Sequence, residues 1–98
     1  MTISCGLIAG RHKLPDYVKD YVFRTDIPQT HICDSAYLDR ICTDFLDKHP
    51  NADMVCVYVT GFTPAMLALV KACSARKIHL MAMNYDRENR NFWSQEVI

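Results

Sequence analysis

Three short apolar runs divide the chain, and each is followed by a polar turn. They cover residues 3–9 (ISCGLIA), 53–60 (DMVCVYVT) and 78–85 (IHLMAMNY). Apolar runs of this length, bounded by turn residues, are more typical of buried strands than of helices. The pattern therefore predicts three strands, with residues 53–60 as the central strand of a sheet that is covered on both faces.

Two segments between these runs repeat their apolar residues at helical spacing. The first begins at Asp34 or Ser35, either of which can cap a helix, and ends before a Pro-Asn pair. The second ends at about Arg76, with Thr63 as its candidate N-cap and Pro64 at the first helical position. The apolar faces consist of Leu38, Ile41, Cys42, Phe45 and Leu46 in the first helix and Met66, Leu69, Val70 and Cys73 in the second.

The remaining two segments are less regular. Residues 17–27 (YVKDYVFRTDI) begin with helical spacing, whereas the composition from Val22 to Thr25 favours a strand. We expect a short helix or turn that leads into an edge strand. At the other end, the polar loop 86–91 (DRENRN) precedes residues 92–98 (FWSQEVI), which we expect to return as an antiparallel strand.

Strands that alternate with amphipathic helices predict a mostly parallel sheet with right-handed crossovers. We therefore expect residues 1–98 to form a single α/β domain. Its architecture would be a small Rossmann-like fold, with a mostly parallel sheet, two helices and a C-terminal antiparallel edge hairpin.

The composition is that of a folded chain, with 98 residues of which 50% are hydrophobic and 22% charged. Because this hydrophobic share is high for so small a domain, we expect a homodimer that covers part of the surface. Eleven basic and eleven acidic residues balance. No basic field is available for duplex nucleic acid, so we expect no such partner.

The N-terminal residues lack the order of a signal peptide, and no apolar run approaches membrane length. We expect a cytoplasmic protein without a membrane partner. The five cysteines include no C-x-x-C pair, which fits buried free thiols in a reducing compartment. The spacing of His31, Cys33 and His49 matches no standard zinc site, so we expect neither a metal nor another cofactor.

Candidate binding chemistry gathers where the predicted strands end. In an open parallel sheet, ligands bind beyond the carboxyl ends of the strands. Three polar loops follow the three buried strands, and parallel strands would bring these loops to one edge. The loops are Gly10-Arg11-His12-Lys13, Thr60-Gly61-Phe62-Thr63 and Asn84-Tyr85-Asp86-Arg87.

These loops suit an anionic ligand that carries an aromatic base. The open amino end of the second helix offers backbone N–H groups and the positive end of the helix dipole. Gly61 allows close approach to the backbone, and the hydroxyls of Thr60 and Thr63 add donors. The groups available for phosphate charge are Arg11, Lys13 and Arg87, and those available for stacking on a base are Phe62 and Tyr85.

Each feature also has a purely structural explanation. The turn before Thr63 can serve only to cap the helix, and the loop at residues 10–13 can be solvated surface. Tyr85 can pack at the sheet edge, and the pair Phe92-Trp93 can pack at an edge or at a dimer contact. The sequence leaves these alternatives open.

Residues 59–66, Val-Thr-Gly-Phe-Thr-Pro-Ala-Met, resemble the strand–turn–helix signature of CRISPR-associated Rossmann-fold (CARF) sensor domains. That family carries a Thr-Gly-Gly-Thr-Lys-x-Met type of turn. The resemblance covers about ten residues clearly and the α/β order of the chain loosely. It implies a dimeric protein of antiviral defence that binds cyclic oligoadenylates, and some members of the family cleave them as ring nucleases.

The sequence departs from the family pattern at two positions. Phe62 stands where the family usually has a second glycine, and Pro64 stands where it often has lysine. Only Thr60, Gly61 and Thr63 therefore carry over, as phosphate or ribose contacts.

A ring nuclease of this kind would need no metal, because the 2′-hydroxyl of the ligand attacks the adjacent phosphate. The protein would align this attack and stabilise the developing charge. His12 is the candidate general acid or base, and Arg11 or Lys13 would stabilise the charge.

The expected function is binding of a cyclic oligonucleotide, with either cleavage or sequestration. The alternative belongs to another class: a non-enzymatic protein–protein interaction module of a virus or mobile element. Such a module would use the antiparallel edge and the pair Phe92-Trp93.

Overall fold

The computed structural model describes residues 1–10 and 13–98. Eight elements follow one another along these residues. They are β1 (Thr2–Ile8), β2 (Tyr21–Phe23), a short 3-10 helix (Gln29–His31), α1 (Ser35–Asp47), β3 (Met54–Tyr58), α2 (Thr63–Ala75), β4 (His79–Asp86) and β5 (Asn91–Glu96).

The strands form one sheet in the order β2-β1-β3-β4-β5. β1 is parallel to β2 and β3, β4 is parallel to β3, and β5 returns antiparallel to β4. The predicted fold class is therefore confirmed. The chain forms an α/β domain with a mostly parallel sheet, two helices and an antiparallel hairpin at its C-terminal edge.

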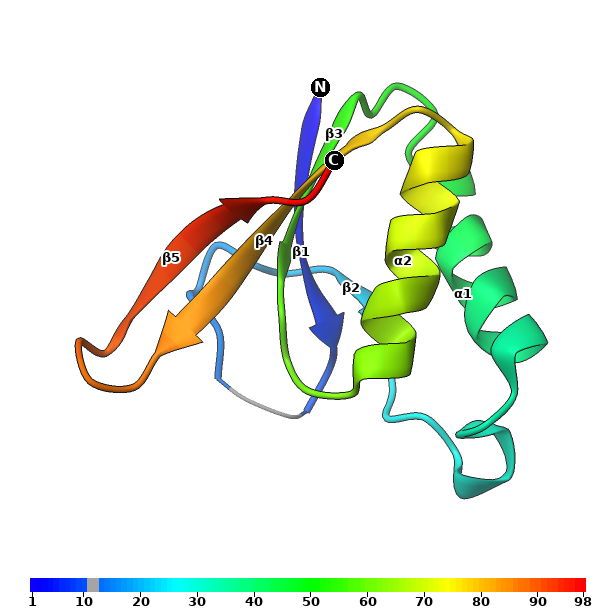
Figure 1. The fold of residues 1–98 in the computed structure, drawn as a ribbon, viewed down its shortest axis with the longest axis horizontal. Coiled ribbons are helices and arrows are strands. Elements are labelled where there is room, and N and C mark those ends of the chain that lie inside the picture. Colours follow the sequence, from blue (N-terminus) through cyan, green and yellow to red (C-terminus); the bar gives the residue numbers. More distant parts are fainter. Residues whose placement is uncertain (11–12) are drawn as a thin grey trace.

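Both helices pack on the same face of the sheet, side by side, as Figure 1 shows. The chain passes from β1 to β2 in one direction and then through β3 and β4 in the other. Right-handed crossovers then place α1 and α2 on one face and the β1–β2 connection on the opposite face. Fully buried side chains fill the layer under the helices, among them Cys5, Leu7, Val55, Val57, Leu69 and Leu80.

The β1–β2 connection crosses the other face, and its described residues 13–20 contain no helix. We call its residues 13–20 the strap. Leu14 and Val18 of the strap are buried against Tyr58 of β3. The hydroxyl of Tyr17 is hydrogen-bonded to the hydroxyl of Tyr58. The strap is thus attached to the sheet by a few side chains.

This thin cover corrects one expectation about the central strand. β3 is apolar on both faces, but only the face under the helices is fully buried. On the strap side, Met54 and Cys56 remain half-buried. The difference arises because a strap of eight residues covers less of a sheet than a helix of thirteen does.

The start of α1 agrees with the sequence, whereas the start of α2 differs. Asp34 caps α1 by accepting a hydrogen bond from the Tyr37 N–H at 3.1 Å. Thr63, expected as the N-cap of α2, is instead its first residue, and Pro64 is the second. Phe62 takes the N-cap position with φ 58°, ψ 91° and no side-chain cap. The shift arises because Gly61 and Phe62 both turn with positive φ before the helix begins.

The ambiguous segment 17–27 resolves in favour of the strand. β2 covers three of its residues and forms the edge of the sheet beside β1. Among the described residues, neither α1 nor α2 has the length and hydropathy that crossing a bilayer requires.

Both chain ends lie at the amino edge of the parallel strands. The Met1 ammonium contacts the Asp53 carboxylate at 2.9 Å, just before β3. At the start of β4, the Leu80 N–H donates to the Ile98 carbonyl at 3.0 Å. The two ends are therefore close together, as Figure 1 shows.

Candidate functional site

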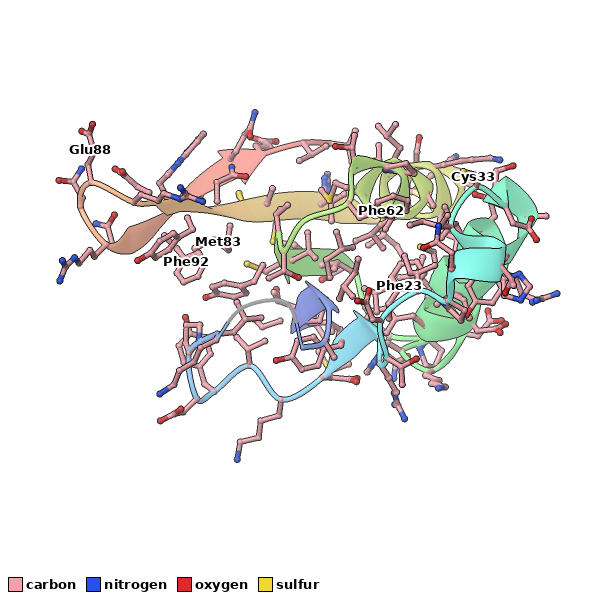
Figure 2. All side chains as sticks on the ribbon, turned by 90° about the horizontal axis from the view of Figure 1, so that it is seen from below. Phe23, Cys33, Phe62, Met83, Glu88 and Phe92 are labelled. Carbon is pink, nitrogen blue, oxygen red and sulfur yellow. The ribbon has the colours of Figure 1, made fainter. Side chains whose placement is uncertain are left out.

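A pocket of about 450 Å³ opens at the carboxyl edge of the sheet, between the strap and the β4–β5 hairpin. Figure 2 looks onto this edge and shows Met83 and Phe92 pointing from the hairpin into the space between the hairpin and the strap. The lining residues are Lys13, Leu14, Val59, Thr60, Asn84, Tyr85, Arg87 and Phe92. The pocket borders the β1/β3 position where the strand order reverses, which is the usual ligand position in open α/β sheets.

The fold brings the three predicted loops together at this pocket. Each loop contributes at least one lining residue, because β1, β3 and β4 are parallel and end at the same edge. The predicted site residues that line it are Lys13, Thr60, Asn84, Tyr85 and Arg87.

The lining combines positive charge with aromatic rings. Lys13 and Arg87 contribute cations from opposite sides, and none of the described lining residues is acidic. Tyr85 and Phe92 are register partners across the hairpin, with ring centroids 5.2 Å apart in an edge-to-face arrangement. The side chain of Tyr85 remains 52% exposed. This arrangement leaves an aromatic surface free beside two cations.

Polar side chains hold the hairpin in shape around the pocket. The Asn84 amide donates to the Gln95 side-chain oxygen across the hairpin at 3.1 Å. In the turn, the Asp86 carboxylate accepts from the Asn89 side chain at 2.8 Å and from the Glu88 N–H at 3.0 Å. These hydrogen bonds, the Asn89 side chain first, lower the pKa of Asp86 below its usual value. The ionised carboxylate therefore stabilises the turn that carries Arg87.

Thr60 lines the pocket, but its hydroxyl is bonded within the protein. It accepts a hydrogen bond from the Ile8 N–H at 3.1 Å and donates one to the Ile8 carbonyl at 3.0 Å. The side chain is 1% exposed. Thr60 therefore joins the ends of β1 and β3, and its hydroxyl offers no free donor to a ligand.

The other predicted residues lie outside the pocket lining. Gly10 and Gly61 have φ of 80° and 63°, so both occupy the left-handed region that glycine tolerates. Thr63 is exposed at the start of α2. Figure 2 shows Phe62 on the helix side of the sheet, where it packs against the main core. Two further predicted residues, Arg11 and His12, lie outside the described residues.

Three lining residues were not predicted as site residues: Leu14, Val59 and Phe92. The sequence could have indicated Phe92, because a four-residue loop between Asp86 and Asn91 places Phe92 opposite Tyr85. Leu14 is the apolar residue of an otherwise polar turn, which indicates a contact but does not identify its partner.

The Tyr58 hydroxyl near the pocket and the thiols in the core under the helices are poor proton donors at neutral pH. Burial, assisted by the hydrogen bond to Tyr17, raises the pKa of the Tyr58 hydroxyl well above its usual range. Burial likewise raises the pKa of Cys42 to about 12 and that of Cys73 to about 11. All five cysteines are free, with Cys33 exposed. The described residues contain no group of three or more candidate metal ligands.

Comparison with protein-family models, with curated proteins and with solved structures finds no match. The chemistry of the pocket is therefore the evidence on which a function can be argued.

Proposed function

We propose that the pocket at the carboxyl edge binds a nucleotide-type anion, and that the ligand is a cyclic oligonucleotide which the protein cleaves or sequesters. The observation that carries the proposal is the placement of Lys13 and Arg87 beside the exposed ring of Tyr85 in a pocket of about 450 Å³. A cation next to an accessible aromatic ring suits a phosphate attached to a base.

The size of the pocket fits one unit of such a ligand. Small-molecule sites typically enclose about 300–1,000 Å³, so the pocket holds one nucleotide and leaves the remainder of a ring outside its mouth. The base would stack on Tyr85, while Asn84 holds the hairpin beside it through its hydrogen bond to Gln95. Lys13 and Arg87 would neutralise phosphate oxygens on either side.

If the ligand is cleaved, the pocket residues would stabilise negative charge, and none of them would serve as a buried general base. Lys13 and Arg87 would stabilise negative charge that develops when the 2′-hydroxyl attacks the phosphate. Tyr58 would not take part as a base, because its raised pKa keeps the hydroxyl protonated at neutral pH. His12 is the proposed general acid or base.

The test is a mass balance on purified protein incubated with cyclic di-, tri-, tetra- and hexanucleotides. The filtrate is analysed by chromatography and mass spectrometry before and after heat denaturation. New linear products indicate a nuclease, and a ligand that disappears and returns intact indicates sequestration. A panel that passes through unchanged would refute the proposed function.

Two matched variants test whether the pocket is the binding site. Lys13→Gln removes a lining cation, and Lys19→Gln removes an exposed cation of the strap that does not line the pocket. Because a hydrogen bond to a charged group contributes about 1.5–3 kcal/mol, we expect Lys13→Gln to weaken binding at least tenfold. Equal affinities for the two variants, measured by calorimetry, would show that the ligand binds elsewhere on the protein.

A further inference from the structure

Within residues 1–10 and 13–98, β5 is an edge strand without a neighbour on its outer side. It pairs with β4 in an unbroken register from Asp86–Asn91 to Met81–Glu96. Five of its six residues are exposed, and Trp93 is 51% exposed. Edge strands are usually protected by proline, lysine, a bulge or a cover. The sequence of β5, NFWSQE, contains neither proline nor lysine, and its register shows no bulge from Asn91 to Glu96. A bulge follows the strand, where the Val97 and Ile98 N–H groups both donate to the Leu80 carbonyl.

The register shows which backbone groups of β5 point outward. In an antiparallel pair, successive residues alternate between bonding to the neighbour and pointing away from it. The Val97 N–H donates to the Leu80 carbonyl at 2.9 Å, so the odd-numbered residues face β4. The N–H and carbonyl groups of Phe92, Ser94 and Glu96 therefore point away from the sheet.

We propose that β5 pairs antiparallel with β5 of a second copy of this chain, so that two sheets join into one across a twofold axis. A self-complementary edge is the simplest basis for such a dimer, because each strand supplies the donors and acceptors that the other lacks. The other edge strand, β2, has only three residues and lies beside α1. β5 is therefore the longer free edge of the described sheet.

Charge complementarity selects the register. If Trp93 lies on the axis, Phe92 stands opposite the partner's Ser94, and the outward groups of both residues meet. Arg90, the turn residue just before β5, then lies across from the partner's Glu96, and this contact occurs twice. Within residues 1–10 and 13–98, neither Arg90 nor Glu96 forms an ion pair, so both charges are free to pair between copies.

Analytical ultracentrifugation of the full chain over a wide range of concentrations tests this pairing. We expect wild-type protein to dimerise and Ser94→Pro to remain monomeric, because proline removes an outward N–H without touching the bonds to β4. Ser94→Ala is the matched control and should dimerise as wild type does. Wild-type protein that stays monomeric at every concentration would overturn the proposal.

A charge swap tests the register and does not depend on a proline being tolerated. Glu96→Arg places an arginine opposite the partner's Arg90, so the dimer dissociation constant should rise at least about tenfold. The double variant Arg90→Glu with Glu96→Arg should restore wild-type dimerisation. A dimer that is unaffected by Ser94→Pro and by Glu96→Arg, with the fold verified by circular dichroism, would place the interface elsewhere and refute the pairing.

Discussion

Thr60 joins the ends of two strands through a single hydroxyl group. The hydroxyl accepts a hydrogen bond from the Ile8 N–H and donates one to the Ile8 carbonyl, so both backbone groups at the end of β1 are satisfied beyond the last residue of β3. This double contact fixes the spacing between β1 and β3 at the point where the pocket begins. The Thr60 side chain, which the sequence suggests as a ligand contact, therefore holds two strands together.

Replacing Thr60 with valine is therefore expected to destabilise the protein. The β-branch is kept, but the N–H and carbonyl of Ile8 lose their partner in a buried environment. An unsatisfied buried polar group costs about 1–3 kcal/mol in the free energy of unfolding. Urea denaturation of Thr60→Val and Thr60→Ser measures the cost, since serine keeps the hydroxyl. Equal stability of the two variants would show that the hydroxyl bonds contribute little.

Phe62 occupies a backbone conformation that suits glycine better than an aromatic residue. Its φ of 58° lies in the left-handed region, while its ring packs against the core. Burial of the ring stabilises the folded protein, whereas the left-handed backbone conformation of Phe62 destabilises it.

Two substitutions at Phe62 separate these contributions. Phe62→Ala and Phe62→Gly both remove the ring, but only glycine relieves the positive φ. We expect the glycine variant to be more stable than the alanine variant by about 1 kcal/mol. Thermal unfolding of both proteins gives the difference. An alanine variant at least as stable as the glycine variant would contradict a left-handed backbone at this position.

The strap stands between β1 and β2, where another sheet of this kind would have a crossover helix. It approaches β1 closely at Gly6, where an added Cβ would lie 2.5 Å from the Tyr21 ring and 2.7 Å from the Leu14 side chain. The missing side chain of Gly6 thus allows the Leu14 side chain and the Tyr21 ring to lie directly on β1.

Gly6→Ala is expected to push these residues away from the sheet. Overpacking of one methyl group costs about 1–3 kcal/mol when the neighbours cannot move freely. Ser4→Ala is the matched control, because Ser4 lies two residues earlier on the same face of β1 and is exposed. Urea denaturation should show a loss for Gly6→Ala alone. A Gly6→Ala protein as stable as wild type would show that the strap adapts at no cost.

Regular elements could be predicted from the sequence, and the strap could not. The helices and buried strands depend on local periodicity, as in α1 with its cap at Asp34, and these predictions are confirmed. The position of the strap depends on tertiary contacts of Leu14 and Val18, whose partners the local sequence does not identify. The same limit applies to the pocket: Tyr85 and Arg87 follow from the end of a strand, but the hydroxyl contacts of Thr60 depend on strand pairing.

For the molecule as a whole, buried thiols make the free energy of unfolding depend on pH in the alkaline range. Cys42 and Cys73 lie in the core with pKa values of about 12 and about 11, against an ordinary value of 9.0. Both values are raised because burial disfavours the thiolate. The folded state therefore keeps protons that the unfolded chain releases.

The free energy of unfolding should accordingly be independent of these thiols below pH 9 and fall as pH rises above it. The loss is about 1.4 kcal/mol per pH unit for each thiol until its folded-state pKa is reached. Urea denaturation between pH 7 and 11 gives the profile. Cys73→Ala should show a shallower fall than wild type, whereas an identical slope would exclude Cys73 as a source of the dependence.

The two chain ends meet at the amino edge of the sheet, and the pocket opens at the carboxyl edge. A fluorescent label or a biotin attached at either end would therefore be separated from the pocket by the length of the strands. Protein immobilised on a sensor chip through Met1 or Ile98 would present the mouth of the pocket to the solution. Both attachment points should then report the same ligand affinity.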